Sequence, residues 1–373
     1  MRGTVLIVFG TRPEAIKLAP VISAFREQQP EVRVVVCSTG QHREMLRQVT
    51  DLFRIECQIS LEVMRPDQTL AGLTGRLFEA IDIVINQVRP DWLLVQGDTT
   101  TAFVGATAGY YQRVKVGHVE AGLRTGDKFR PFPEEVNRRF VTVVADAHFA
   151  PTERAREALL REHVATDSIF VTGNTVVDAV MEVSRRPYDW AAGPLGKISP
   201  TRPIVLITAH RRESFGETFR DICLAIGDLA DTHCGSGVQF VYPVHLNPNV
   251  RGPVNEILGG RANITLLDPL DYQSLVQLMM RSTLVLTDSG GIQEEAPAFG
   301  VPVCVMRDTT ERPEGIDAGV AFLVGTRRES IVAAADRLLN AACAGGKPHT
   351  SNPYGDGQAG TRIAAILTES MSR

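Results

Sequence analysis

Short apolar runs alternate with longer amphipathic stretches along almost the whole chain. The runs are rich in β-branched residues, and several are apolar at consecutive positions, which is typical of parallel strands covered by helices on both faces. A repeated order of strand, helix and strand predicts doubly wound α/β sheets. The predicted strands are Val5–Phe9, Val32–Cys37, Trp92–Val95, Lys115–Val119, Ile169–Thr172, Ile204–Thr208, Gln239–Tyr242, Leu284–Thr287 and Val303–Met306.

The alternation stops between Ser184 and Pro203, where four prolines and two glycines gather before a new strand begins at Ile204. Such a stretch is typical of a connection between domains. The length agrees, because 373 residues exceed the roughly 250–300 residues at which a single hydrophobic core stops growing. We therefore expect two α/β domains.

Composition narrows the class of ligand. The formal net charge is −4, so there is no basic excess to neutralise phosphates, and we expect no nucleic acid as a partner. No apolar run approaches the ~20 residues that span a membrane.

The opening segment MRGTVLIVFG fits a first strand better than a signal peptide. We expect a cytoplasmic protein whose six cysteines, none in a C-x-x-C pair, stay reduced.

Two cations flank the turn after the first predicted strand. Ligands of open α/β sheets bind beyond the carboxyl ends of the strands. Gly10 permits a tight turn there, and Arg12 and Lys17 belong to the start of the next helix, whose N-terminus attracts anions. The alternative is a plain strand–turn–helix with a surface arginine. We favour an anion site.

Carboxylates follow the later strands of the same half. Asp98 and Glu120 come after two predicted strands, and Glu134 and Glu135 follow a proline-rich turn. Clustered carboxylates drive one another's pKa values apart, which is how a site obtains both an acid and a base. The alternatives are a helix cap for Asp98 and ordinary first-turn charge for the two glutamates.

The second half carries two polar turns at strand ends. His210 is followed by two arginines, and because histidine changes charge near neutral pH, we favour contact with a phosphate or leaving group over a capping loop. Farther on, an apolar strand leads into Ser289, Gly290 and Gly291 and then a helix. The glycines let backbone N–H groups close on a pyrophosphate. Glu295 lies about one helical turn later, where an acidic residue can accept both hydroxyls of a ribose.

Metal and nicotinamide motifs give no support for a cofactor. The chain has no H-E-x-x-H and no Asp-x-Asp pair, so we predict no metal site. Residues 355–360 match G-x-G-x-x-G, but they follow a proline turn rather than a strand, which argues against a nicotinamide site.

These motifs belong to an ordered set that runs from Gly10 to Ala359. The set is GTRPEAIKLAPV, QHREML, GDTTTAF, VGHVEAGLRTGD, PEEVNRR, TGNTVVDA, AHRRESFG, YPVHLNPNV, TDSGGIQEEAP, RDTTERPEG and NPYGDGQA. It resembles the bacterial non-hydrolysing UDP-N-acetylglucosamine 2-epimerases. The resemblance implies the glycosyltransferase-B fold, in which two Rossmann-like domains face a cleft and the last helix crosses back. We therefore expect an N-terminal domain at 1–168 with the helix 361–373, and a UDP-binding domain at 169–360.

The resemblance also implies an activity. The family interconverts UDP-GlcNAc and UDP-ManNAc without a cofactor, usually as a homodimer, and feeds surface polysaccharide synthesis. The implied reaction eliminates UDP from C1 while a base removes the hydrogen on C2. UDP then returns to the 2-acetamidoglucal with a proton delivered to the other face. This chemistry needs a carboxylate on each face and stabilisation of departing UDP.

The roles carry over onto matching positions. The resemblance makes Asp98, Glu120, Glu134 and His210 the catalytic candidates. The substrate-binding candidates are Arg12, Lys17, Ser289, Gly290, Gly291, Glu295 and Arg312. Some family members bind a second UDP-GlcNAc as an activator, and the candidate positions for it are Gln41, Glu135, Arg211 and His245.

The chain departs from the family pattern at several positions. Gln96 stands where bacterial members usually carry His, and Arg130 where Ser is more usual. Glu44 and Asp67 stand where activated members can have Gln and Arg. The segment 270–275, on the uracil side, lacks the aromatic residue often found near its end. The departures at Glu44 and Asp67 bear on activation, and the departure in the segment 270–275 bears on the contact with uracil.

Three other functions fit the same fold. A hydrolysing epimerase would release UDP and free ManNAc, and a glycosyltransferase would need an acceptor and leave C2 unchanged. A nucleotide-sugar sensor needs the binding groups alone. The presence of Asp98, Glu120 and Glu134 argues against a sensor, and product analysis separates the two enzymes.

Overall fold

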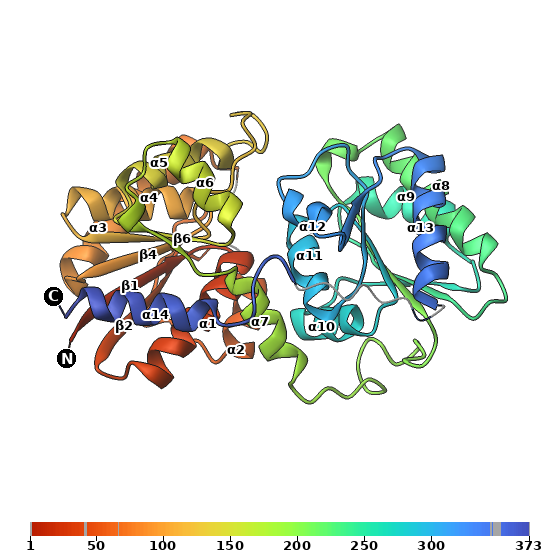
Figure 1. The fold of residues 1–373 in the computed structure, drawn as a ribbon, viewed down its shortest axis with the longest axis horizontal. Helices are drawn as coiled ribbons and strands as arrows, with labels where there is room; N and C mark the ends of the chain where they lie inside the picture. Colours follow the sequence, from red (N-terminus) through yellow and green to blue (C-terminus); the bar gives the residue numbers. More distant parts are fainter. Residues whose placement is uncertain (1, 41–42, 66, 344, 346–351, 373) are drawn as a thin grey trace. The chain divides into compact units, whose positions relative to one another are not determined.

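The computed structural model describes residues 2–40, 43–65, 67–343, 345 and 352–372 (Figure 1). The chain forms two compact units, Met1–Ala179 with Tyr354–Arg373, and Val180–Pro353. Each unit contains one parallel sheet flanked by helices. This confirms the predicted fold class of two Rossmann-like doubly wound domains. In the described part of the chain, no helix is both long and apolar enough to cross a membrane.

The first unit is built around a seven-stranded sheet. Its elements are β1 (Gly3–Phe9), α1 (Arg12–Gln28), β2 (Val32–Ser38), α2 (Arg43–Leu52), β3 (Ile59–Ser60), α3 (Leu70–Val88), β4 (Trp92–Gln96), α4 (Thr100–Tyr111), β5 (Lys115–Val119), α5 (Glu134–Val144), β6 (Ala147–Ala150), α6 (Glu153–Arg161), η1 (Thr166–Ser168), β7 (Ile169–Val171), the first half of α7 (Thr175–Ser184), and α14 (Ala359–Ser370). The strand order β3-β2-β1-β4-β5-β6-β7 puts the topological switch between β1 and β4. Open α/β sheets bind ligands at such a switch.

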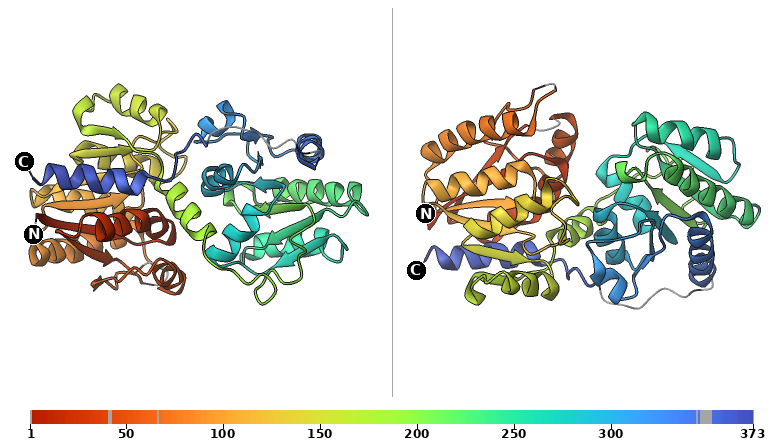
Figure 2. Two further views of the ribbon diagram at one scale, coloured as in Figure 1. Left: turned by 60° about the horizontal axis from the view of Figure 1, so that its bottom comes forward. Right: turned by 90° about the horizontal axis from the view of Figure 1, so that it is seen from above.

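Side chains of the first sheet pack against two layers of helices, because successive residues of a strand point to opposite faces. Leu6 and Val8 of β1 belong to a buried cluster with Leu77 of α3 and Val104 of α4. Helices α3, α4 and α5 are neighbours in that layer, and α1 packs beside α14 in the other (Figure 2).

The second unit has a six-stranded sheet of order β10-β9-β8-β11-β12-β13. Its elements are the second half of α7, β8 (Ile204–Thr208), η2 (Arg212–Ser214), α8 (Glu217–Thr232), β9 (Gln239–Pro243), α9 (Pro248–Leu258), β10 (Ile264–Leu267), α10 (Tyr272–Met280), β11 (Leu284–Thr287), α11 (Gly290–Glu295), η3 (Ala296–Phe299), β12 (Val303–Val305), α12 (Pro313–Asp317), β13 (Ala321–Leu323) and α13 (Arg328–Cys343). The switch here lies between β8 and β11.

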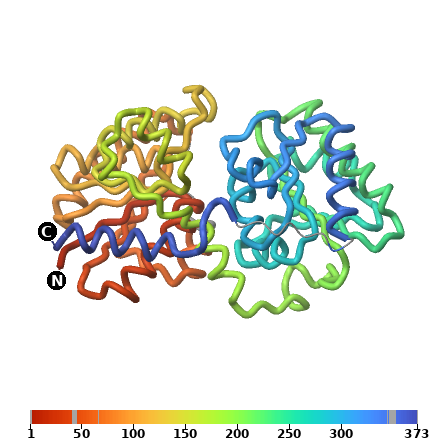
Figure 3. Tube along the Cα trace, in the orientation of Figure 1, coloured from red at the N-terminus to blue at the C-terminus, as the bar shows by residue number. Residues whose placement is uncertain are grey.

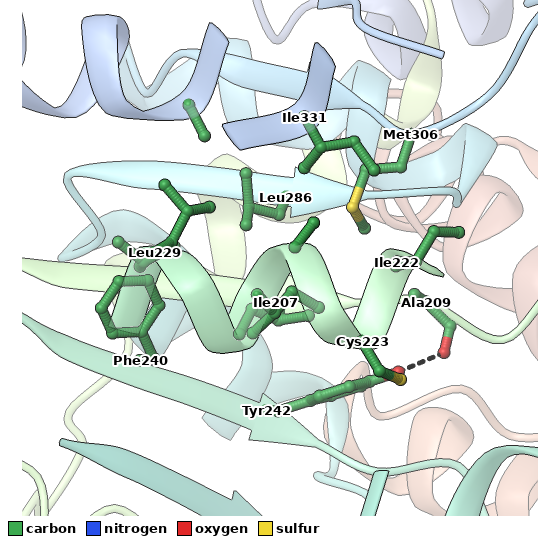
Figure 4. Close-up of a cluster of buried hydrophobic side chains, with 14 of the residues drawn as sticks. Ile207, Ala209, Ile222, Cys223, Leu229, Phe240, Tyr242, Leu286, Met306 and Ile331 are labelled. Atoms are coloured by element: carbon green, nitrogen blue, oxygen red, sulfur yellow. Dashed lines mark hydrogen bonds between the residues drawn. The ribbon is translucent and has the colours of Figure 1, made fainter. Parts of the chain in front are cut away.

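The core of the second unit fixes the backbone beside a polar turn (Figure 4). Ile222 and Cys223 of α8 pack in a buried cluster with Ile207 of β8 and Tyr242 of β9. The Tyr242 hydroxyl donates a hydrogen bond of 2.6 Å to the carbonyl oxygen of Ala209. Burial raises the pKa of Tyr242, so the hydroxyl keeps its proton. The residue after Ala209 is His210, and the core therefore positions the start of that turn.

The boundary between the two units follows the boundary between the two sheets. The boundaries lie at Ala179 and Pro353, whereas the sequence pattern places them after residues 168 and 360. The structure differs because β7 pairs with β6 and so completes the first sheet. The predicted strands also leave out β3, β6, β10 and β13, which have two to four residues and lie at or next to the edges of the sheets.

The returning C-terminal segment is anchored to the first unit (Figure 3). The backbone N–H of Asn174 donates to the carbonyl of Tyr354 at 2.7 Å. Asp178 accepts a hydrogen bond of 2.8 Å from the N–H of Gly360. A Cβ on Gly360 would lie 2.7 Å from backbone atoms of Pro20 in α1. Glycine is therefore needed where α14 begins.

Replacing Gly360 with alanine tests this close approach. Because the added methyl must push α14 away from Pro20, we expect the free energy of unfolding to fall by about 1–3 kcal/mol. Gly75→Ala in α3 is the matched control, since a Cβ there meets nothing within 4 Å and alanine favours a helix by ~1 kcal/mol over glycine. Urea unfolding should show opposite signs for the two variants, and equal signs would contradict the packing.

Asp178 gives a pH test of the same segment. Burial raises the pKa of its carboxyl from 3.8 to about 6, although the N–H groups of Gly360 and Ala359 lower it in part. The folded protein thus holds a proton that the unfolded chain releases earlier, so this contribution to stability is complete below pH 3.8 and is lost as the pH rises through about 6.

Asp178→Asn should remove that pH dependence. We expect the wild type to gain stability relative to the variant by up to about 3 kcal/mol between pH 7 and pH 4. Unfolding free energies of both proteins, measured at the two pH values, check this. A difference that does not change with pH would refute the assignment.

Candidate active site

Glu120 is held at the carboxyl edge of the first sheet, directly after β5. Its Oε1 accepts hydrogen bonds from Lys17 Nζ and, at 3.1 Å, from Asn174 Nδ2, while its Oε2 accepts one from Gln96 Nε2. Its backbone φ is 67°, in the left-handed region that residues other than glycine rarely adopt. Such strain persists where the surroundings hold the residue, and it is concentrated at functional positions.

The ion pair between Lys17 and Glu120 is removed from water. The two side chains are 9% and 7% exposed. A buried pair offsets the cost of desolvation only when additional hydrogen bonds satisfy its remaining atoms, and the amides of Gln96 and Asn174 supply them. Lys17 therefore contacts a carboxylate at this edge.

Asp98 is the second carboxylate of the same edge. Its Oδ2 accepts a hydrogen bond from Arg138, and Asn137 Nδ2 donates to its backbone oxygen at 2.9 Å. Burial raises the pKa of Asp98, Arg138 lowers it in part, and the charge of Glu120 raises it again. Asp98 pairs with a guanidinium and Glu120 with an ammonium. Two carboxylates in different environments can divide the tasks of acid and base.

Glu14 ties together the turns that carry these residues. Its Oε2 accepts bonds from the backbone N–H groups of Gly10 and Thr11, at 3.1 and 2.7 Å, and its Oε1 accepts one of 2.7 Å from Thr99 Oγ1. Thr11 and Thr99 are the N-caps of α1 and α4. Burial raises the pKa of Glu14 even with these donors. The turn before α4 contains Asp98, so Glu14 also positions that carboxylate.

Glu134 and Glu135 differ sharply although they are adjacent. Glu134 is the first residue of α5 and is partly buried. Glu135 is fully buried, accepts bonds of 3.1 and 3.3 Å from the N–H groups of Thr125 and Gly126, and pairs with Arg138 at 3.4 Å. Glu135 thus holds a loop and orients the arginine that binds Asp98.

In the second unit, Asp288 links the ends of β11 and β8. Its side chain is 0% exposed, and its Oδ2 accepts bonds of 2.7 and 2.8 Å from the backbone N–H groups of His210 and Arg211. The ring of His210 stacks on that of His245, with the centroids 5.3 Å apart and the planes 7° apart. His210 follows β8, and residues after β11 and β9, Asp288 and His245, fix its position.

The glycine turn after β11 lies against Arg312. Ser289 is the N-cap of α11. A Cβ on Gly290 would lie 2.8 Å from the guanidinium carbon of Arg312, so a larger residue would displace that side chain. Arg312 also pairs with Glu294, Nε to Oε1, at 2.7 Å. The turn thus brings backbone N–H groups and a fixed cation together, a combination suited to phosphate oxygens.

Glu311 gathers three arginines beside this turn. It pairs with Arg312 and Arg307 at 2.8 Å and with Arg211 at 3.4 Å. Burial opposes its ionisation, but the three guanidinium groups outweigh burial and lower the pKa of Glu311 to about 2. The carboxylate is therefore charged and fixes the arginines in place.

Glu295 ends α11 and is buried. Its Oε1 accepts a bond of 3.5 Å from the hydroxyl of Tyr272, the first residue of α10. An aromatic residue of the segment 270–275 therefore does lie at the site, near the segment's start rather than its end. Among the described residues, no group of three or more His, Cys, Asp and Glu side chains is placed to hold a metal ion.

Comparison with known proteins decides the family. A family model described as UDP-N-acetylglucosamine 2-epimerase matches residues 25–368. The UDP-N-acetylglucosamine 2-epimerase of Escherichia coli (strain K12) is 51% identical over 372 residues, which cover 97% of this chain and 98% of that protein. The one from Bacillus subtilis (strain 168) is 46% identical over 368 residues, with coverages of 97% and 94%. The crystal structure of UDP-GlcNAc 2-epimerase from Neisseria meningitidis bound to UDP-GlcNAc is similar with a TM-score of 0.90 and 43% identity, and it covers 98% of this chain and 100% of that one.

The chain belongs to the UDP-N-acetylglucosamine 2-epimerase family. This confirms the resemblance seen in its motifs, and it makes the protein an enzyme of that family. The catalytic and binding candidates of this family member fall into two groups, one at the carboxyl edge of each sheet. Arg12 is a partly exposed residue at the start of α1. Gln41 lies outside the described residues.

Four side chains around these groups are not indicated by the sequence pattern. They are Glu14, Arg138, Asn174 and Tyr272, which bond to Thr99, Asp98, Glu120 and Glu295. In the sequence, Glu14 and Arg138 look like the ordinary charged residues of a helix, so nothing marks them as neighbours of the site. Asn174 follows a predicted strand end within three residues, and this proximity is the feature that could have found it.

Replacing Glu14 with glutamine tests its role in joining the two turns. The amide presents N–H groups to neighbours that are themselves donors, so we expect the free energy of unfolding to fall by about 1–3 kcal/mol. Turnover should fall as well, because the turn before Asp98 loses its tie to α1. Glu27→Gln on the exposed side of the same helix is the control. Equal stability of the two variants in urea would sink the idea.

Proposed function

We propose that this protein catalyses the reversible epimerisation of UDP-N-acetylglucosamine to UDP-N-acetylmannosamine at C2, without a cofactor. The observation that carries the proposal is the pair of carboxylates at one sheet edge, Asp98 bound to Arg138 and Glu120 bound to Lys17. The relatives from Escherichia coli and Bacillus subtilis are UDP-N-acetylglucosamine 2-epimerases, which supports it. The similar crystal structure from Neisseria meningitidis is bound to UDP-GlcNAc, which supports the choice of substrate.

The chemistry explains why two carboxylates are useful. The hydrogen on C2 is not next to a carbonyl, so its direct removal is very difficult. Elimination solves this: a base takes the C2 proton, the C1–O bond to UDP breaks, and a C1–C2 double bond forms in 2-acetamidoglucal. Re-addition reverses the electron flow, with UDP oxygen bonding to C1 and a proton arriving on the opposite face of C2. One group must accept a proton on one face and another must donate one on the other.

The first unit supplies the proton-transfer groups in this proposal. Asp98, Glu120 and Glu134 are the acid and base candidates, and burial raises the pKa of Asp98, which favours its protonated form and suits a group that must hold a proton. Lys17 keeps an ammonium against Glu120. Arg12 contributes a cation at the N-terminus of α1, where an anion is favoured.

The second unit supplies the groups for UDP. Ser289, Gly290 and Gly291 receive the diphosphate at the start of α11, with Arg312 beside them. Glu295 receives the ribose hydroxyls. His210 stabilises the departing diphosphate, since a protonated imidazole neutralises charge that develops on the leaving oxygen.

A second UDP-GlcNAc as activator is part of the same proposal. Its candidate contacts are Gln41, Glu135, Arg211 and His245. The burial of Glu135 under the 125–126 loop means that it acts through that loop. A rate curve that is sigmoidal in substrate supports activation, and a hyperbolic curve unchanged by trace UDP-GlcNAc would count against it.

We also propose a cytoplasmic homodimer that serves surface polysaccharide synthesis. Exposed apolar side chains on neighbouring helices support the dimer: Ile83 of α3 is 56% exposed, Tyr111 of α4 70%, and Val143 of α5 82%. Sedimentation equilibrium checks it, and a monomer at micromolar concentration would contradict it.

Proton NMR of the enzyme with UDP-GlcNAc in D2O tests the activity. We expect UDP-ManNAc signals to grow while deuterium enters C2 and no free sugar accumulates. Free ManNAc with UDP would instead indicate a hydrolysing epimerase. Unchanged substrate, despite UDP binding, would indicate a transferase or a sensor and would remove the roles of the three carboxylates.

Asp98→Asn tests the proton-transfer role. The amide cannot exchange a proton, so we expect kcat to fall by roughly 10²–10⁴-fold while UDP binding is largely kept. Glu157→Gln, on an exposed stretch of α6 in the same unit, should leave both unchanged. Full activity of the Asp98 variant would show that the acid and base lie elsewhere.

A further inference from the structure

Asp288 carries a carboxylate oxygen that the fold leaves without a hydrogen bond. Its Oδ2 accepts two backbone N–H groups, but its Oδ1 is buried and has no hydrogen-bond partner among the described residues. Unsatisfied buried oxygens are rare in native proteins because desolvation is costly, and each one calls for an explanation.

The side chain that this oxygen faces is His210. The distance from Asp288 Oδ1 to His210 Nδ1 is 3.7 Å, slightly beyond a hydrogen bond. Stacking on His245 fixes the plane of the imidazole, and the backbone N–H of His210 is itself bound to Asp288. A shift of well under an ångström therefore suffices to close a bond from Nδ1–H to Oδ1.

We infer that Asp288 is a positioning residue for His210, an inference that rests on the function proposed above. The carboxylate selects the tautomer with the proton on Nδ1, which leaves Nε2 as the reactive nitrogen. When Nε2 also takes a proton, the negative charge of Asp288 stabilises the imidazolium. His210 can then face the departing diphosphate as a cation and become neutral when UDP returns.

The surroundings of His210 make Asp288 the source of this effect. Asp288 after β11 and His245 after β9 contact the imidazole, and Arg211 is the next residue on the same turn, where it pairs with Glu213 and Glu311. Arg211 and a protonated His245 both disfavour a second positive charge on His210. Asp288 favours it, and because Asp288 is 0% exposed, water screens its charge little.

Asp288→Asn separates orientation from structure. The asparagine oxygen can still accept the N–H groups of His210 and Arg211, so the turn should be kept. Its amide N–H₂ then faces Nδ1 and forces the proton to Nε2, the wrong tautomer for the role. A comparable exchange in serine proteases leaves the geometry intact and lowers kcat by about 10⁴-fold.

The expected result has two independent readouts. First, kcat should fall by roughly 10²–10⁴-fold, with KM and UDP affinity changed by less than about threefold. Second, ¹⁵N–¹H NMR of histidine-labelled protein, with the His210 signals identified by their loss in His210→Gln, should show the Nδ1–H tautomer in the wild type and the Nε2–H tautomer in Asp288→Asn.

Asp336→Asn is the matched control. It removes the carboxylate of a second carboxylate–imidazole pair in the same unit, His233 Nε2 to Asp336 Oδ1 at 2.9 Å, between α8 and α13. Activity and the His210 signals should not change in this variant.

Unchanged kcat in Asp288→Asn, or the same His210 tautomer in both proteins, would overturn the inference. Equal losses of kcat and UDP affinity would also overturn it, because they would indicate that Asp288 merely holds the turn. The tautomer does not depend on turnover. A wild type without epimerase activity but with the Nδ1–H tautomer would therefore refute the proposed function and leave the orientation of His210 standing.

Discussion

The cost of removing carboxylates from water governs the arrangement at both sheet edges. Glu14, Glu120 and Asp288 follow strands β1, β5 and β11 and are almost fully buried. A buried carboxylate is tolerated only where donors surround it. The donors are backbone N–H groups of the same turn for Glu14 and of the turn after β8 for Asp288, hydroxyls of helix caps, side-chain amides, and one ammonium. Each carboxylate thus ties together segments that are separate along the sheet edge, and this fixes the positions of the candidate site residues beside it.

The two units apply this constraint differently. In the first unit, Lys17 and the amides of Gln96 and Asn174 occupy both oxygens of Glu120. In the second unit, Asp288 binds backbone at one oxygen and faces an imidazole with the other. Rigid turns of this kind lower the reorganisation that charge development requires, which is the main source of electrostatic catalysis. The same sheet architecture thus holds paired carboxylates in the first unit and a cluster of arginines in the second.

Much of this arrangement follows from local pattern. Apolar runs bounded by turn residues identify nine of the strands, and the alternation with helices identifies the class of sheet. The motifs also place Asp98, Glu120, His210 and the glycine turn after strands, and a parallel sheet brings all carboxyl ends to one edge. Partners of these residues, such as Arg138 and Asn174, are not predicted from the sequence. Nothing local distinguishes a helix arginine that binds a carboxylate of the candidate site from one that faces water.

The sequence by itself determined the fold class, the family, and the residue types that gather at each sheet edge, because periodicity, turn chemistry and motif order are local properties of a chain. The tertiary structure decided which group each of them meets: that Lys17 lies against Glu120, that Glu135 is buried under a loop, and that β7 closes the first sheet. These outcomes depend on contacts between residues far apart in the chain. They are settled by burial, by the number of donors within reach of each charge, and by the close approach that a glycine such as Gly290 permits.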